Sequence, residues 1–318
     1  MLAWLGRVGG VAAVAWLVYT LAGCSTLPTI VPDLRRAEPR MQMVGARGPL
    51  SAERSRAILK GLQERGGKTS IFDRHLALEE AIVGSPLTTG NSVLLLKDGP
   101  ATYRAMLAAI EAARDHVNME TYIFEDDEVG QRFADALIDK QQQGVQVNLL
   151  RDAVGTLSTP AAFFERMTAS GIQVLEFNPI NPLAVRGQWT LNQRDHRKLL
   201  IVDGRTAFLG GINISSVYSG SSLKTLHRSH PDAAHEWRDT DLQLRGPVVA
   251  ELQRLFFAAW TGQQGPAVAP RNYFPPPVVA GRQVVRAIGS TPEEPFSQIY
   301  ATLLSAIGSA EVSVRLTN

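Results

Sequence analysis

A histidine and a lysine two residues apart give this sequence its clearest chemical signal. His196 and Lys198 lie at the start of an apolar run, Leu199 to Val202. On an extended strand, alternate side chains share a face, so their Cα atoms would lie ~6.5 Å apart on one face. An imidazole and an ammonium group at that separation can flank one phosphate group. The pair therefore predicts a catalytic site for a phosphate ester, with Lys198 as a phosphate-binding cation.

The residues that follow extend this pattern. Asp203 begins an Asp-Gly hairpin signal, and a second apolar run leads to Gly210, Gly211 and Asn213. Two glycines allow the backbone to approach a bound oxyanion closely, and an asparagine amide can donate a hydrogen bond to it. We therefore expect Gly210, Gly211 and Asn213 to take part in phosphate binding.

A plain β-hairpin with polar ends is the alternative interpretation. It explains the Asp-Gly turn, but not the histidine, lysine, paired glycines and asparagine together. With the His, Lys and Asp contents of this chain, the pattern His-x-Lys-x4-Asp should arise by chance only ~0.005 times. The sequence therefore favours a phosphate site carried on a hairpin.

Elements that could position this site begin at residue 91. Apolar residues at helical spacing alternate with short apolar or alternating runs typical of strands. The stretches predicted as strands are 92–100, which ends in a turn, 117–127, 145–156 and 172–179, and the predicted helices are 101–116, 129–144 and 159–171. Glu120 and Tyr122 fall on the strand face opposite Met119, and we leave their role open. Strand–helix alternation predicts an α/β fold with a sheet flanked by helices.

A weak internal repeat suggests a second copy of this unit. At an offset of 197 residues, Tyr300, Leu304 and Ile307 align with Tyr103, Leu107 and Ile110. We therefore expect a first half over residues 91–262. Residues 263–318 would hold a Pro/Gly-rich linker followed by the strand, helix and second strand that open another half.

The N-terminus is typical of an export signal. Arg7 precedes an apolar run that ends in Leu21-Ala22-Gly23-Cys24, which resembles a bacterial lipobox. This resemblance implies a signal peptide over 1–23 and a lipid anchor on Cys24, with the protein facing the periplasm and the outer membrane slightly favoured. An uncleaved anchor or a plain signal peptide is the alternative. Residues 24–90 would form a tether and a helical region.

Composition narrows the function classes. Hydrophobic residues make up 45% of the chain, charged residues 19%, and the net charge is +2. Such a balance fits a globular protein and gives little support for nucleic-acid binding through a basic surface. A single cysteine excludes an intramolecular disulfide and a cysteine metal cluster. We expect no cofactor and no metal.

The pattern from His196 to Asn213 resembles the HKD signature of the phospholipase D superfamily. The stretches "METYIFEDD", "GVQVNLLRDAVGT" and "WRDTDLQLRGPVVAELQRLFFAAW" are similar to its cardiolipin synthase branch. This resemblance implies an α/β/α sandwich around a mixed sheet, and two halves whose HKD motifs meet at one site. It also implies a metal-free exchange through a phosphohistidine.

Residue roles follow from the resemblance. It implies that His196 is the nucleophile or its acid–base counterpart, and that Lys198 and Asn213 hold phosphoryl oxygens. Asp203 belongs to the catalytic motif but is expected to hold the turn and the local charge balance. The family's carboxylate that orients the histidine matches Asp239, and Asp241 on the same strand face is a second candidate.

Three functions stay open at this point. The first is a phosphatidyltransferase that makes cardiolipin from phosphatidylglycerol in the membrane. The second is a phosphodiesterase that hydrolyses a phospholipid or a nucleic acid. The third is a catalytically incomplete half-site, because the sequence holds one HKD motif. A second copy of the chain, or a partner chain, would then supply the second motif, and the sequence resembles a truncated or split two-motif protein.

Overall fold

The computed structural model describes residues 42–66, 76, 84–181, 183, 193–220, 237–290 and 297–316. The predicted signal peptide and Cys24 lie outside these residues. Among the described helices, none is long and apolar enough to cross a membrane.

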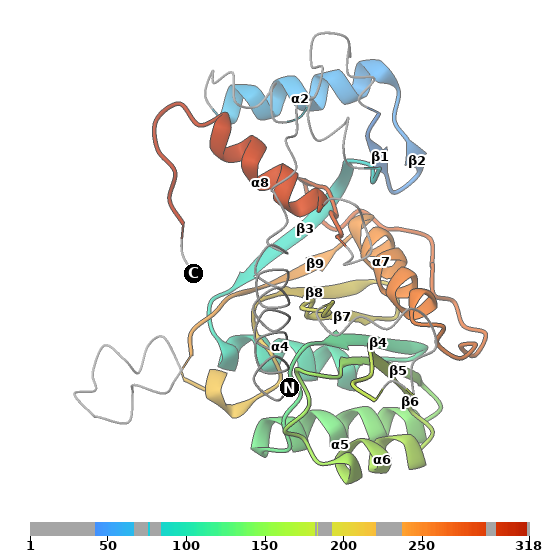
Figure 1. The fold of residues 1–318 in the computed structure, drawn as a ribbon. Coiled ribbons are helices and arrows are strands. Elements are labelled where there is room, and N and C mark those ends of the chain that lie inside the picture. Colours follow the sequence, from blue (N-terminus) through green and yellow to red (C-terminus); the bar gives the residue numbers. More distant parts are fainter. Residues whose placement is uncertain are drawn as a thin grey trace, which may run out of the picture. The chain divides into compact units, whose positions relative to one another are not determined.

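A mixed sheet forms the centre of the described chain (Figure 1). The strands follow the order β2-β1-β3-β9-β8-β7-β4-β5-β6, with β10 paired to β3. Strands β4, β5 and β6 run parallel, whereas β7, β8 and β9 are antiparallel to their neighbours. The bounds are β1 Val44–Gly45, β2 Gly48–Pro49, β3 Thr88–Leu96, β4 His116–Thr121, β5 Gln146–Asp152, β6 Gln173–Phe177, β7 Leu199–Val202, β8 Thr206–Gly210, β9 Asp241–Arg245 and β10 Gln283–Val285.

Helices cover both faces of the sheet, which confirms the predicted α/β/α architecture. The helices are α2 Ala52–Gly66, α4 Gly99–Glu111, α5 Glu128–Gln142, α6 Ala161–Ala169, α7 Val248–Gly262 and α8 Gln298–Gly308, with a 3-10 turn, η2, at Ser216–Tyr218. One core cluster joins α4, α5 and α6 to strand residues such as Met119 and Leu200. The other joins α7 to strand residues such as Leu199 and Ile201. Adjacent β7 residues thus face opposite layers, as strand geometry requires.

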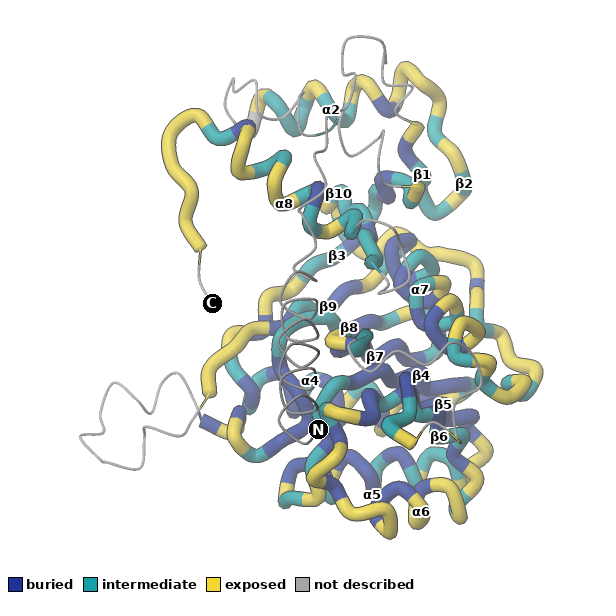
Figure 2. The backbone as a smooth tube through the Cα atoms, viewed as in Figure 1, coloured by how far each residue is buried: buried dark blue, intermediate teal, exposed yellow. Residues whose placement is uncertain are grey.

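Both faces of β4 are buried (Figure 2). Its sequence still alternates, because Val117 and Met119 enter one core cluster while the polar Asn118 and Glu120 are buried on the opposite face. The α4 helix begins at the N-cap Asp98, whose side chain accepts a hydrogen bond from Ala101 N, and α5 begins in the same way at Asp127. Such caps satisfy free N–H groups of the first turn. Both predicted helices form, and they begin at Gly99 and Glu128, slightly before the predicted starts at 101 and 129.

The β7–β8 hairpin also forms as predicted. Its two turn residues, Asp203 and Gly204, have φ angles of 52° and 60°. Positive φ at both central positions is the geometry of a type I′ turn, which suits the twist of a hairpin. The His196–Lys198 pair precedes one strand of this hairpin, and Gly210 ends the other.

Three parts of the chain differ from the sequence-based expectation. The predicted tether includes β1 and β2, beside the fully buried Met43. The β10 strand joins the sheet of the first half by pairing with β3, whereas we expected it to open another half. The α8 helix forms, but the strand expected after it is absent from residues 311–316. A strand needs a neighbour for its backbone hydrogen bonds, and those residues have no pairing partner among the described strands.

Candidate active site

His196 and Lys198 lie in an extended segment immediately before β7. Lys198 Nζ donates a hydrogen bond to the backbone oxygen of His196 at 2.8 Å. The ring of Tyr122 lies against both, with its centroid 4.6 Å from that of the imidazole and 5.1 Å from Lys198 Nζ. The structure therefore brings the predicted pair together and adds Tyr122. From the sequence, Tyr122 was placed on the strand face opposite Met119 and its role was left open.

Burial lowers the pKa of both His196 and Lys198. Lys198 is 5% exposed, and burial lowers its pKa to about 8, against the opposing pull of nearby carboxylates that include Asp195 and Asp239. Burial and the Lys198 cation lower the pKa of the His196 imidazole below its ordinary value. At neutral pH the imidazole is therefore mostly neutral and can act as a nucleophile, while Lys198 is mostly protonated and can attract an oxyanion.

Asn213 lies near this pair in the fold, but its amide has other partners. Its Oδ1 accepts from Ile123 N at 3.1 Å, and its Nδ2 donates to the Tyr218 hydroxyl at 2.9 Å. The side chain is buried. In this structure Asn213 ties the loop after β8 to the loop after β4, whereas we expected its amide to point at a phosphate.

The paired glycines have a packing role that the sequence did not reveal. A Cβ on Gly210 would lie 1.9 Å from Asp241 Oδ1 and 2.4 Å from Thr240 O, and a Cβ on Gly211 would lie 2.1 Å from Asp239 Oδ2. Strands β8 and β9 place Gly210 opposite Asp241. The glycines thus admit two carboxylates to the site end of the sheet, in place of the direct approach to phosphate that we expected.

We expect Gly210→Ala to lower the free energy of unfolding by more than ~2 kcal/mol, because the added methyl meets backbone and carboxylate atoms. Gly262→Ala is the matched control: it lies at the end of α7 with nothing within 4 Å of the added Cβ. That change should be neutral or stabilise by up to about 1 kcal/mol. Urea unfolding of both variants measures the difference, and equal stabilities would contradict the packing role.

Asp239 and Asp241 lie close enough to Lys198 for their carboxylates to affect its pKa. Asp241 is buried and accepts from Ile212 N at 3.2 Å, and burial raises its pKa to about 7. Asp239 accepts from Thr240 N. Within the described part of the chain, neither carboxylate hydrogen-bonds to the His196 imidazole. The orienting role of Asp239 therefore stays a prediction.

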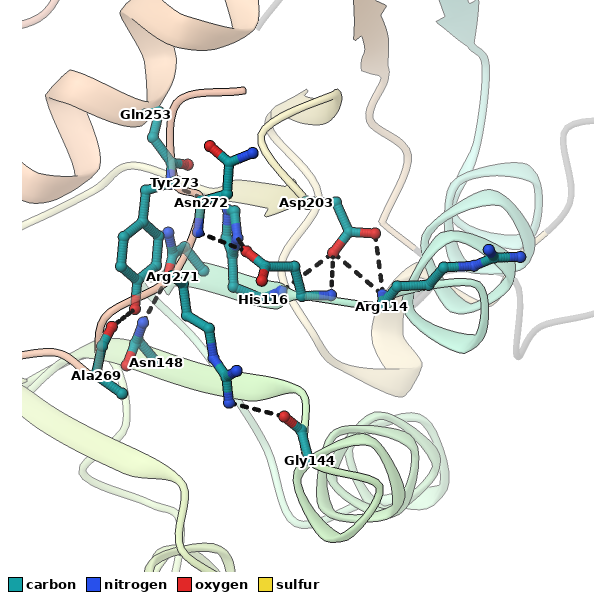
Figure 3. Close-up of polar contacts among 12 residues, drawn as sticks. Arg114, His116, Gly144, Asn148, Asp203, Gln253, Ala269, Arg271, Asn272 and Tyr273 are labelled. Atoms are coloured by element: carbon teal, nitrogen blue, oxygen red, sulfur yellow. Dashed lines mark hydrogen bonds and ion pairs between the residues drawn. The ribbon is translucent and has the colours of Figure 1, made fainter. Parts of the chain in front are cut away.

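Asp203 lies at the opposite end of β7 from Lys198. Its carboxylate accepts hydrogen bonds from the backbone N–H groups of Arg114, Asp115 and His116, at distances from 2.8 to 3.2 Å (Figure 3). These bonds join the hairpin turn to the start of β4. This contact is structural, as expected for this residue, and gives Asp203 no place beside His196.

A cavity of about 480 Å³ opens beside His196. Its polar lining includes Arg194, Arg197 and Gln263, and its apolar lining includes Phe177 and Ile299. A cavity of this size with convergent polar groups is typical of a small-ligand site. No group of His, Cys, Asp and Glu residues in the described regions is arranged to hold a metal ion.

A family model and similar known proteins both point to cardiolipin synthases. Residues 106–223 match the family model described as cardiolipin synthase, PLD-like domain. Cardiolipin synthase 1 of Bacillus anthracis is 33% identical over 274 residues, which are 81% of this chain and 51% of that protein. Cardiolipin synthase A of Pseudomonas entomophila is 36% identical over 240 residues, which are 73% of this chain and 46% of that protein.

Solved structures resemble the chain more distantly. The phospholipase D family member Nuc from Salmonella typhimurium has a TM-score of 0.38 and 18% identity, covering 54% of this chain and 95% of that one. The chain spans about half the length of the cardiolipin synthases it matches. The residues from His196 to Asn213 lie within the region matched by the family model. The chain therefore belongs to the phospholipase D superfamily, in its cardiolipin synthase-like branch.

Proposed function

We propose that this protein transfers phosphatidyl groups and makes cardiolipin from phosphatidylglycerol. The observation that carries the proposal is the His196–Lys198 pair, in which a neutral imidazole that lines a cavity has a buried cation as its neighbour. The named relatives, which are cardiolipin synthases, support the same reaction.

In the proposed reaction, a ring nitrogen of His196 attacks the phosphorus of one phosphatidylglycerol. The new P–N bond replaces the P–O bond to the headgroup, and glycerol leaves with a proton from a general acid. A hydroxyl of a second phosphatidylglycerol then attacks the phosphorus, loses its proton to the same group, and breaks the P–N bond. Lys198 stabilises the negative charge that develops on the phosphoryl oxygens. The balance is two phosphatidylglycerols to one cardiolipin and one glycerol.

The direct test incubates the purified protein with phosphatidylglycerol vesicles, with and without an added primary alcohol, and separates the lipids by thin-layer chromatography. Cardiolipin with released glycerol supports transfer, and a phosphatidyl ester of the added alcohol supports the covalent intermediate. Phosphatidic acid alone indicates a hydrolase, which is the second function open from the sequence. Cleavage of a nucleic acid without lipid turnover would contradict the lipid assignment.

We also propose that a second HKD motif completes the site, supplied by another copy of this chain or by a partner chain. In a homodimer with one shared site, each copy contributes one His196. When wild-type and His196→Asn chains are co-expressed in equal amounts and pair at random, about one quarter of the dimers hold both histidines. The mixture should then show about one quarter of the activity of an equal total amount of wild-type protein. Retention of about one half would rule out the homodimer.

The N-terminal segment supports a membrane location for this reaction. We propose that Cys24 carries a lipid anchor and that the protein faces the periplasm, because the residues before it form the lipobox-like stretch. The phospholipid substrate would then lie in the same membrane. Metabolic labelling with a radioactive fatty acid should mark the wild-type chain but not Cys24→Ala, and equal labelling would contradict the anchor.

A further inference from the structure

The backbone that carries His196 is not held by the sheet. The ladder between β4 and β7 ends at Glu120 opposite Leu199. His196 lies three residues before Leu199, in a segment without regular secondary structure. Side chains must therefore fix the position of this segment.

A network of side chains from Glu120, Asp152, Asp195 and Arg197 holds this segment in place. Asp152 Oδ2 accepts from Asp195 N at 2.9 Å, and Asp195 Oδ1 accepts from Arg197 N at 3.0 Å. Arg197 Nη2 lies 2.8 Å from Glu120 Oε1, and its Nε lies 3.3 Å from Asp195 Oδ1. Arg197 stands between His196 and Lys198 in the chain, and its side chain reaches Glu120 of β4 and, with His196, lines the cavity beside α7.

Glu120 stands out in this network because its side chain is completely buried. Burial and the neighbouring Asp195 carboxylate raise its pKa, and Arg197 opposes that rise. Burying a carboxylate is costly unless a cation accompanies it, and removal of one partner leaves the other charge uncompensated. The pair is thus poorly explained as a contribution to stability alone.

We propose that Glu120 and Arg197 are positioning residues, a buried ion pair that sets the placement of His196 and Lys198 for the reaction. The guanidinium is held by Glu120 on one strand and by Asp195 on its own segment. With the middle residue anchored, the two flanking side chains both lie against the ring of Tyr122. This inference rests on the proposed phosphoryl-transfer function for its kinetic consequence, but not for its structural one.

Glu120→Gln tests the pair, because it keeps the side-chain size and replaces the carboxyl group that faces Arg197 with an amide. We expect kcat to fall about 10²-fold with little change in KM, since a shift of about 1 Å in a reacting group costs that much. Glu176→Gln is the matched control. Glu176 pairs with Arg151 across β5 and β6, and Arg151 packs over Phe164 of α6. The control should retain wild-type kcat.

A second readout does not depend on the reaction. The imidazole ¹⁵N signals of His196 in the full chain, assigned by their loss in His196→Asn, report its tautomer and titration. They should shift in Glu120→Gln and stay unchanged in Glu176→Gln. If the wild-type protein turns over no lipid, the proposed function fails while these signals still decide the placement of His196.

Arg197→Lys covers the case in which Glu120→Gln does not fold, because it keeps the positive charge but loses the geometry that joins Glu120 and Asp195. It should also shift the His196 signals. Wild-type signals and wild-type kcat in either folded variant, or equal changes in the Glu176→Gln control, would overturn the proposal.

Discussion

Replacing His196 with asparagine is expected to lower kcat for lipid transfer by at least about 10³-fold, because in the proposed reaction this residue supplies the attacking nitrogen. The thermal unfolding midpoint should change little, since among the described residues the imidazole ring packs against one other ring, that of Tyr122 at 4.6 Å. Lipid product formation by thin-layer chromatography measures the effect.

The covalent step gives this prediction a sharper form. Wild-type protein quenched during turnover should carry a phosphatidyl group on an acid-labile P–N bond, and His196→Asn should carry none. Phosphoryl labelling that persists in the variant would place the nucleophile elsewhere. Unchanged turnover in a correctly folded variant would remove His196 from the mechanism altogether.

Replacing Lys198 with methionine is expected to lower kcat/KM by about 10²- to 10³-fold, since in the proposed reaction this cation stabilises the charge on the phosphoryl oxygens. The same cation predicts the pH dependence of the wild-type protein. Because burial lowers the Lys198 pKa to about 8, activity should fall as the pH rises through 8. This alkaline limb should be absent from the residual activity of Lys198→Met.

Stability should change in the opposite direction over the same range. The folded protein releases the Lys198 proton near pH 8, whereas the unfolded chain holds it until about 10.5. Between those values the unfolded state binds more protons, so this group makes the free energy of unfolding rise with pH. Denaturant unfolding from pH 7 to 10.5 should show this contribution in wild type and in Lys140→Met, a control at the end of α5, but not in Lys198→Met. The same slope in all three would contradict the assignment.

Most helices around the site and the β7–β8 hairpin could be predicted because they depend on local sequence patterns. The helices of residues 99–169 follow from apolar residues at helical spacing, and the hairpin follows from Asp203-Gly204 between two apolar runs. Strand alternation also predicted that His196 and Lys198 share one face; both do lie against Tyr122, although they precede the strand. Such features need only the residues near them in the chain.

The partners of these residues could not be predicted in the same way. Asn213 was expected to bind phosphate, but its amide bonds to Ile123 and Tyr218. Gly210 was expected to admit a phosphate, and it admits the carboxylate of Asp241 instead. Ile123 and Asp241 come from segments distant in the chain, and nothing in the local sequence specifies which segment will lie alongside.

The sequence by itself determined the pair of reactive residues, the hairpin that follows it and the α/β class. Only the tertiary structure decided that Tyr122 lies against His196 and that Glu120 pairs with Arg197. It also decided that the Asp203 carboxylate bonds to the start of β4, at the other end of β7 from His196. The reason is the order of strands. The sheet places β4 beside β7 and β8 beside β9, and these neighbours are chosen by packing over the whole core, which no local pattern encodes.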